Sequence, residues 1–293
     1  MIARAERLLR VSLTVRDLKR MERFYRDAFG FARVSEGELG EAMLALLGAP
    51  GASARSSLLR LGRQSLELVQ FDPPGLPYPS GGRARDPWFQ HIALVVADMD
   101  AACERLRRLP ITPISDGGPQ RLPPSAGSVV AFKFRDPEGH PLELIHFPAG
   151  TGDPIWREPS RELFLGFDHS AIVAGDAARS RRFYRSQLGF SESSRSRNCG
   201  PEQERLDGEP EDGVDVIGLA PAAAATPHLE LLGYRPVDTA LGRARTDVRD
   251  AASARLVLEV SHLAEGLGTR LEDGSLGAQR LDPDGHRLLL IEP

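Results

Sequence analysis

The stretch Arg23-Phe-Tyr-Arg-Asp-Ala-Phe-Gly-Phe31 returns later in the chain as Arg182-Phe-Tyr-Arg-Ser-Gln-Leu-Gly-Phe190. Asp17 and Asp176 precede the two copies at the same distance. In each copy apolar residues recur at steps of three and four, an aspartate stands where an N-cap belongs, and a glycine lies near the end. This pattern predicts a capped amphipathic helix. The second half of the chain is therefore a duplicate of the first.

A second repeated motif supports the duplication. Asp136-Pro-Glu-Gly-His140 returns as Asp282-Pro-Asp-Gly-His286, and an apolar strand follows each copy. Because Asp, Pro and Gly favour tight turns, both motifs predict turns between strands. We therefore expect His140 and His286, and also His262, to be surface loop residues.

Smaller units repeat within each half. Each unit opens with an apolar strand, continues with a helical stretch and closes with a strand of alternating character. We call these units modules 1 to 4, and they cover residues of about 9–72, 90–148, 167–233 and 254–292. The sequence thus predicts an α+β fold of four βαβββ modules. Connectors rich in Pro and Gly predict an N-terminal domain over 1–150, a linker over 151–166 and a C-terminal domain over 167–293.

Strand alternation places polar side chains on one face. His91 precedes Ile92 and Leu94, which would pack on the helix, so its imidazole is expected to face the opposite way, into a cleft. The same reasoning applies to the Glu of each Leu-Glu-Leu strand. One imidazole and one carboxylate per module can therefore converge, from the candidates His91, His169, Glu67, Glu143 and Glu230.

Composition excludes several classes of protein. The chain has 293 residues, 41% of them hydrophobic and 27% charged, with a net charge of -4. Lys19 and Lys133 are the only lysines, and the arginines are spread along the chain, so no basic face for nucleic acid is expected. Two cysteines make no disulfide framework, no apolar run is long enough to span a membrane, and no export signal is visible. We expect a cytoplasmic protein that binds a small molecule and neither nucleic acid nor membrane.

The modules resemble the vicinal oxygen chelate superfamily, which includes glyoxalases, bleomycin-resistance proteins and extradiol dioxygenases. The resemblance rests on the Phe-Tyr-Arg helix, on the Asp-Pro-x-Gly turn with its Leu-Glu strand, and on His at the start of a first strand. It implies that modules pair into incomplete barrels that hold a divalent metal. The implied metal is Zn, Ni, Co, Mn or Fe. The implied ligands are His91, Glu143, His169 and Glu230.

Module pairing decides whether such a site is complete. If modules 2 and 3 pair across the linker, all four ligands meet, and this crossed pairing is the one we favour. If neighbouring modules pair instead, the fallback ligands are Glu67, His91 and Glu143. Arg10 could then bind an anionic substrate through its guanidinium, although a surface arginine is the simpler interpretation.

The resemblance leaves three functions open. The first is a metal-dependent lyase or isomerase acting on a small vicinal-oxygen substrate, with Glu143 or Glu230 as the base that removes a proton. The second is an Fe(II) extradiol-type dioxygenase, which Lys133 and Leu289 disfavour because that family has other residues there. The third is a metal-free binding protein. We also expect residues 198–204 to line the cleft mouth. His228 shares a strand face with Glu230 and could support the ligands, but we expect it to be an exposed edge residue.

Overall fold

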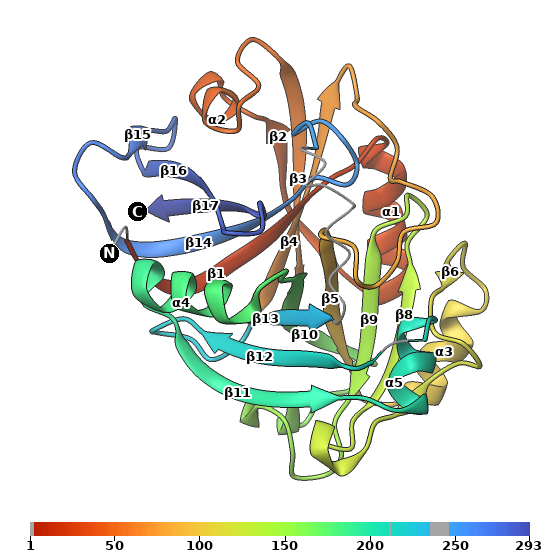
Figure 1. Cartoon of the computed structure of the whole chain (residues 1–293). Coiled ribbons are helices and arrows are strands. Elements are labelled where there is room, and N and C mark those ends of the chain that lie inside the picture. Colours follow the sequence, from red (N-terminus) through yellow and green to blue (C-terminus); the bar gives the residue numbers. More distant parts are fainter. Residues whose placement is uncertain (1–2, 211, 235–245) are drawn as a thin grey trace.

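The computed structural model describes residues 3–210, 212–234 and 246–293. Two open sheets dominate it, with the helices packed against them (Figure 1). The 8-stranded sheet has the order β15-β16-β17-β14-β1-β4-β3-β2. The 9-stranded sheet has the order β11-β12-β13-β10-β5-β9-β8-β6, and its ninth strand, β7, pairs with β8 outside this path. We call them the 1–4 sheet and the 2–3 sheet after the modules that supply their strands.

Modules 1 and 3 share one element order. Module 1 consists of β1 (Ala3–Thr14), α1 (Leu18–Phe29), β2 (Ala32–Glu38), α2 (Glu41–Leu46), β3 (Ser53–Leu61) and β4 (Gln64–Asp72). Module 3 consists of β10 (Phe164–Val173), α4 (Ala177–Leu188), β11 (Ser191–Asn198), α5 (Pro201–Asp207), β12 (Val214–Ala220) and β13 (His228–Tyr234). Asp17 and Asp176 cap α1 and α4, and left-handed Gly30 and Gly189 end them, as the repeated stretch predicts.

Modules 2 and 4 are less regular. Module 2 consists of β5 (Phe89–Val96), α3 (Met99–Leu106), β6 (Thr112–Pro113), β7 (Gln120–Arg121), a 3-10 turn (Pro124–Ala126), β8 (Val130–Arg135) and β9 (Pro141–His146). Module 4 has β14 (Ala254–Leu263), β15 (Thr269–Arg270), β16 (Leu276–Leu281) and β17 (Arg287–Glu292). The helical stretch expected after β14 is wrong, because only residues 264–268 lie between β14 and β15 and they form a turn.

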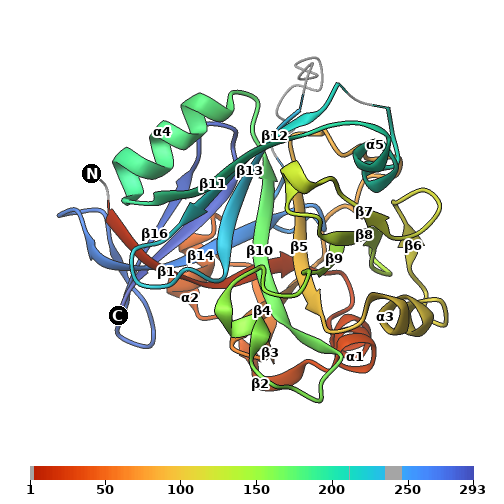
Figure 2. The same ribbon diagram turned by 90° about the horizontal axis from the view of Figure 1, so that it is seen from below.

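The modules pair in the crossed arrangement. β5 of module 2 lies antiparallel to β10 of module 3, and β1 of module 1 lies antiparallel to β14 of module 4. Both central pairs are visible side by side in Figures 1 and 2. Each half of the chain therefore contributes one module to each sheet, and the linker between the halves carries a 3-10 turn at Pro154–Arg157.

The two repeated motifs contact each other and join the sheets. The Tyr25 hydroxyl on α1 donates to Asp136 Oδ2 (3.0 Å), which also accepts from His140 Nδ1 (2.9 Å). His140 Nε2 donates to the carbonyl of Thr14 (2.9 Å) on β1. The expectation of a surface His140 is wrong, because the turn folds inward against β1 and leaves this residue only 2% exposed.

The second half repeats this connection. Tyr184 on α4 donates to Asp282 (3.1 Å), and His286 Nε2 donates to the carbonyl of Val173 (2.7 Å) at the end of β10. His286 is also buried, so the surface expectation is wrong here for the same reason. His262, by contrast, is exposed as expected.

Strand alternation divides the 2–3 sheet as the sequence predicts. Ile92, Leu94 and Val96 pack into the large core with α3, whereas Ala93 and Val95 lie in a separate cluster on the opposite face. That opposite face carries the candidate site. None of the helices in the described part of the chain is both long and apolar enough to cross a bilayer.

Candidate functional site

Four predicted ligands meet on the open face of the 2–3 sheet. β5 and β10 carry His91 and His169, whose Nε2 atoms lie 3.2 Å apart. The flanking strands β9 and β13 carry Glu143 and Glu230. Glu143 Oε2 lies 3.1 Å from His91 Nε2, and Glu230 Oε2 lies 3.4 Å from His169 Nε2. The ligand atoms of His91, Glu143 and His169 all lie within 4.8 Å of one another.

Asp168 orients one of these ligands. Its Oδ2 accepts from His169 Nδ1 at 3.1 Å, and its Oδ1 accepts from Trp156 Nε1 at 2.7 Å. Since Nδ1 donates its hydrogen bond to the Asp168 carboxylate, His169 can present the lone pair of Nε2 to a cation. This mixed imidazole and carboxylate donor set therefore fits a divalent transition metal.

The alternation of side chains along a regular strand does not predict Asp168 as a site residue, because it places Asp168 and its neighbour His169 on opposite faces. The pairing of β10 with β5 shifts register between Phe167 and His169, so Asp168 occupies a β-bulge. A bulge lets consecutive residues turn to the same face. The sequence shows that Asp168 directly precedes His169, but it does not predict the bulge that turns both side chains to the same face.

Burial and neighbouring charges shift the pKa values of the four clustered residues in different directions. Burial opposes protonation of His169, but Glu230, Asp168 and Glu143 outweigh it and raise its pKa to about 9. Burial, with Lys133 and His169 nearby, lowers the pKa of His91. Burial raises the pKa of Glu143, whereas His169 and His228 overcome burial and lower the pKa of Glu230. Negative charge therefore dominates around His169, where a bound cation would compete with the imidazole proton.

Lys133 is a buried cation at the edge of the cluster. Its Nζ donates to Asp207 Oδ1 at 2.5 Å and lies 3.9 Å from Glu143 Oε2. Asp207 at the end of α5 is buried, so this pair ties α5 to β8 beside the candidate ligands. The sequence marks Lys133 only as a departure from a family pattern and indicates no partner for it.

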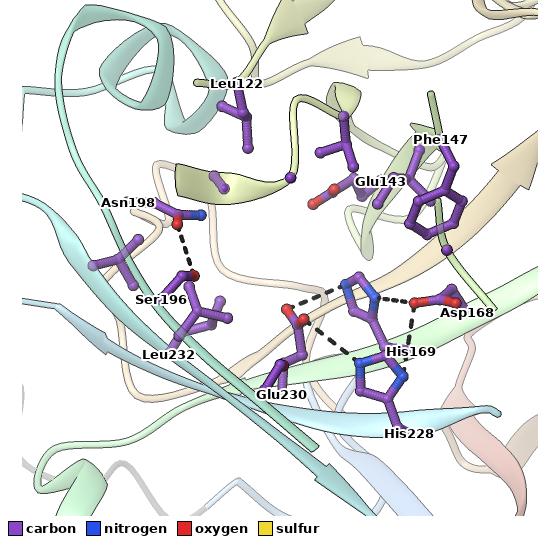
Figure 3. Close-up of a pocket in the computed structure, with 18 of the residues that line it drawn as sticks. Leu122, Glu143, Phe147, Asp168, His169, Ser196, Asn198, His228, Glu230 and Leu232 are labelled. Atoms are coloured by element: carbon purple, nitrogen blue, oxygen red, sulfur yellow. Dashed lines mark hydrogen bonds and ion pairs between the residues drawn. The ribbon is translucent and has the colours of Figure 1, made fainter. Parts of the chain in front are cut away.

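The cluster opens into a cavity of about 580 Å³. His228 lines this cavity between Asp168 Oδ2 (3.7 Å) and Glu230 Oε1 (3.6 Å), as Figure 3 shows. The expectation of an exposed edge residue is wrong for His228. Its side chain is 17% exposed, and β13 is an interior strand of the sheet, between β10 and β12. Asn198 and Gln203 also line the cavity, which agrees with the prediction for residues 198–204.

The same four positions in the 1–4 sheet carry different residues. Strand register places Arg10 where His169 lies, Glu67 where Glu230 lies, Arg255 where His91 lies and Leu289 where Glu143 lies. Arg10 Nε lies 3.4 Å from Glu67 Oε1, and Arg255 is 1% exposed, with its pKa lowered by burial to about 10. Two guanidinium groups would repel a cation there.

The fallback ligand set is therefore divided between the sheets. Glu67 lies on β4 of the 1–4 sheet, whereas His91 and Glu143 lie on the 2–3 sheet. Arg10 is paired with Glu67 and does not join the histidine cluster. Its role in binding an anionic substrate remains a prediction.

Fold and site together define a member of a known superfamily. The family model described as "Glyoxalase/Bleomycin resistance protein/Dioxygenase superfamily" matches residues 7–144 and 166–290, so the chain belongs to this superfamily. The structure resembles glyoxalase I from Zea mays, with a TM-score of 0.62, 17% identity and coverage of 98% of this chain and 92% of that one. It also resembles a Bacillus subtilis protein assigned as a dioxygenase, with a TM-score of 0.58, 12% identity and coverage of 99% and 86%.

Among characterised sequences, one relative is an epimerase. The 2-epi-5-epi-valiolone epimerase of Actinomyces sp is 34% identical over 152 residues, which is 48% of this chain and 79% of the relative. The chain is thus related in sequence to an isomerase and in fold to glyoxalase I.

Proposed function

We propose that the chain is a metal-dependent isomerase that epimerises a small ketone at a carbon beside its carbonyl group. The observation that carries this proposal is the convergence of His91, Glu143, His169 and Glu230 at one end of a cavity. The valiolone epimerase supports it, since a valiolone is a polyhydroxylated cyclic ketone.

The donor set suits one borderline divalent ion. A cation held by these residues would polarise two neighbouring substrate oxygens and stabilise the negative charge that develops on them. Asp168 would keep His169 in the tautomer and orientation that binding requires.

Glu143 and Glu230 are placed for the proton transfers. They lie on β9 and β13, on opposite sides of the central strands β5 and β10. In the proposed reaction one carboxylate takes the proton of the carbon beside the carbonyl, and the C–H electron pair forms an enediolate. The other group, as a carboxylic acid, returns a proton to the opposite face, which inverts the stereocentre.

Solvent exchange tests this proposal. The purified chain is loaded in turn with Mn, Zn, Ni, Co or Fe(II), given 2-epi-5-epi-valiolone in D₂O, and followed by NMR. We expect epimerisation with deuterium at the inverted carbon. Glu143→Gln should lower the rate by about 100-fold or more, because a positioned acid or base contributes on that scale.

Glu67→Gln is the matched control, since Glu67 occupies the position of Glu230 in the 1–4 sheet and should leave the rate unchanged. The absence of exchange with every ion contradicts the proposal. Oxygen uptake on catechols would favour the dioxygenase alternative, and ligand binding that survives chelation would favour the metal-free binding protein.

A further inference from the structure

We propose that Gln203 is a substrate-binding residue whose side-chain oxygen accepts a hydrogen bond from a hydroxyl of a polyhydroxylated ketone in the cavity. This inference rests on the proposed function and specifies the substrate that the same cavity takes. Gln203 lies on α5, an element that carries none of the candidate metal ligands.

Asp207 holds three cavity-lining side chains in place. Its Oδ1 accepts from Lys133 Nζ (2.5 Å), and its Oδ2 accepts from Gln203 Nε2 (2.8 Å) and from the Tyr234 hydroxyl (3.2 Å). Lys133, Gln203 and Tyr234 all line the cavity. We call these three residues with Asp207 the polar wall.

The polar wall fixes which way the amide of Gln203 faces. Because Gln203 Nε2 donates to Asp207 Oδ2, Oε1 must face away from Asp207. Gln203 is 3% exposed, and its Oε1 is buried with no hydrogen-bond donor among the residues that the structure describes. A buried acceptor left without a donor is destabilising, so a donor from a ligand would be favoured at this point.

The ligand chemistry follows from the charge around this oxygen. Oε1 lies on the same side chain that contacts the Asp207 carboxylate, and an amide oxygen offers lone pairs but no proton. Phosphate and carboxylate oxygens, which only accept hydrogen bonds, would leave this acceptor unpaired, whereas a hydroxyl can donate to it. Ser196 and Asn198 on β11 add uncharged polar groups to the cavity, as Figure 3 shows.

Lys133 connects the polar wall to the candidate metal ligands. The same Nζ that contacts Asp207 lies 3.9 Å from Glu143 Oε2. The two parts of the cavity are therefore adjacent, and a ring whose vicinal oxygens face the metal ligands could present another hydroxyl to Gln203.

Calorimetric binding to the Mn-loaded chain tests this inference with two probes. 2-Epi-5-epi-valiolone carries ring hydroxyls, whereas 2-hydroxycyclohexanone keeps only the vicinal oxygen pair. Gln203→Met removes the acceptor, and Gln203→Lys removes it while keeping a donor for Asp207. We expect each variant to weaken binding of the valiolone about tenfold, the usual scale for one hydrogen bond, and to leave 2-hydroxycyclohexanone unchanged.

Gln279→Met is the matched control, because Gln279 on β16 also has a buried Oε1 with no donor in the described part of the chain but lies on the other sheet. It should not change the affinity for either probe. Equal weakening of both probes would make Gln203 a structural residue and overturn the inference, as would unchanged valiolone binding or a wild-type chain that does not bind the valiolone.

The same data separate this inference from the proposed function. Valiolone binding that depends on Gln203, without deuterium exchange, would retain the inference and refute the isomerase. Metal-dependent exchange that Gln203→Met leaves unchanged in both affinity and rate would retain the isomerase and refute the inference.

Discussion

At the scale of single residues, His91 and His140 are equally buried but lie in different environments. His91 is 2% exposed and faces His169 and Glu143 on the open face of the 2–3 sheet, whereas His140 is 2% exposed and connects Asp136 to β1. We expect His91→Ala to abolish tight binding of Mn or Zn and His140→Ala to leave it within about twofold. Metal titration by calorimetry measures both, and equal losses would contradict the assignment of His91.

Asp168 offers a finer test, because it contacts the candidate ligand His169 rather than the ion. Asp168→Asn keeps the size of the side chain but can offer an amide N–H to Nδ1, which would favour the wrong tautomer. We expect metal affinity to fall about 10- to 100-fold, the range typical of partners that orient a ligand. An affinity equal to that of the wild type would show that Asp168 does not orient His169.

His140 predicts a pH dependence of stability. Burial opposes its protonation, but Asp136 and the carbonyl of Thr14 outweigh burial and raise its pKa to about 9, above the unfolded value of about 6.5. Its stabilising contribution is therefore complete below about pH 6.5 and lost as pH rises through about 9.

Denaturant unfolding of the wild type and of His140→Gln measures this contribution. The difference in unfolding free energy should be largest near pH 6 and smaller by a few kcal/mol near pH 10, at about 1.4 kcal/mol per pKa unit. A difference that grows with pH would contradict a protonated His140.

At the scale of elements, the repeated motifs hold the two sheets together. Tyr25→Phe and Tyr184→Phe each remove one buried hydrogen bond to an aspartate, Asp136 or Asp282. We expect each variant to lose about 1–3 kcal/mol of stability, because the aspartate is left one donor short. Similar losses measured by denaturant unfolding would support equivalent roles, whereas a loss in only one half would contradict them.

Most of the element content could be predicted from the sequence, because caps and periodicity are local signals. The helix that contains Arg182 is an example, since Asp176 and Gly189 mark its ends. The inward fold of the Asp-Pro-x-Gly-His turns could not be predicted, because their partners lie on β1 and β10, far away in the chain. The bulge at Asp168 could not be predicted from the sequence either, since a register shift depends on the partner strand.

At the scale of the whole molecule, duplication has produced two sheets, and among the described residues the clustered candidate metal ligands lie on the 2–3 sheet. The crossed pairing brings His91 and His169 together, and sequence could favour it but not establish it, because the linker allows either pairing. In the 1–4 sheet, Arg10 and Arg255 stand at the positions of the two histidines. We therefore expect one divalent ion per chain, measurable by elemental analysis of metal-loaded protein, and two ions per chain would contradict this.

We infer that His91, Glu143, His169 and Glu230 hold a divalent cation. Anomalous diffraction from crystals of the Mn- or Zn-loaded chain locates that cation. We expect one anomalous peak on the open face of the 2–3 sheet, about 2.0–2.3 Å from the Nε2 atoms of both histidines, and no peak between Arg10 and Arg255. A loaded crystal with no peak at these histidines, or with its peak elsewhere, would contradict it.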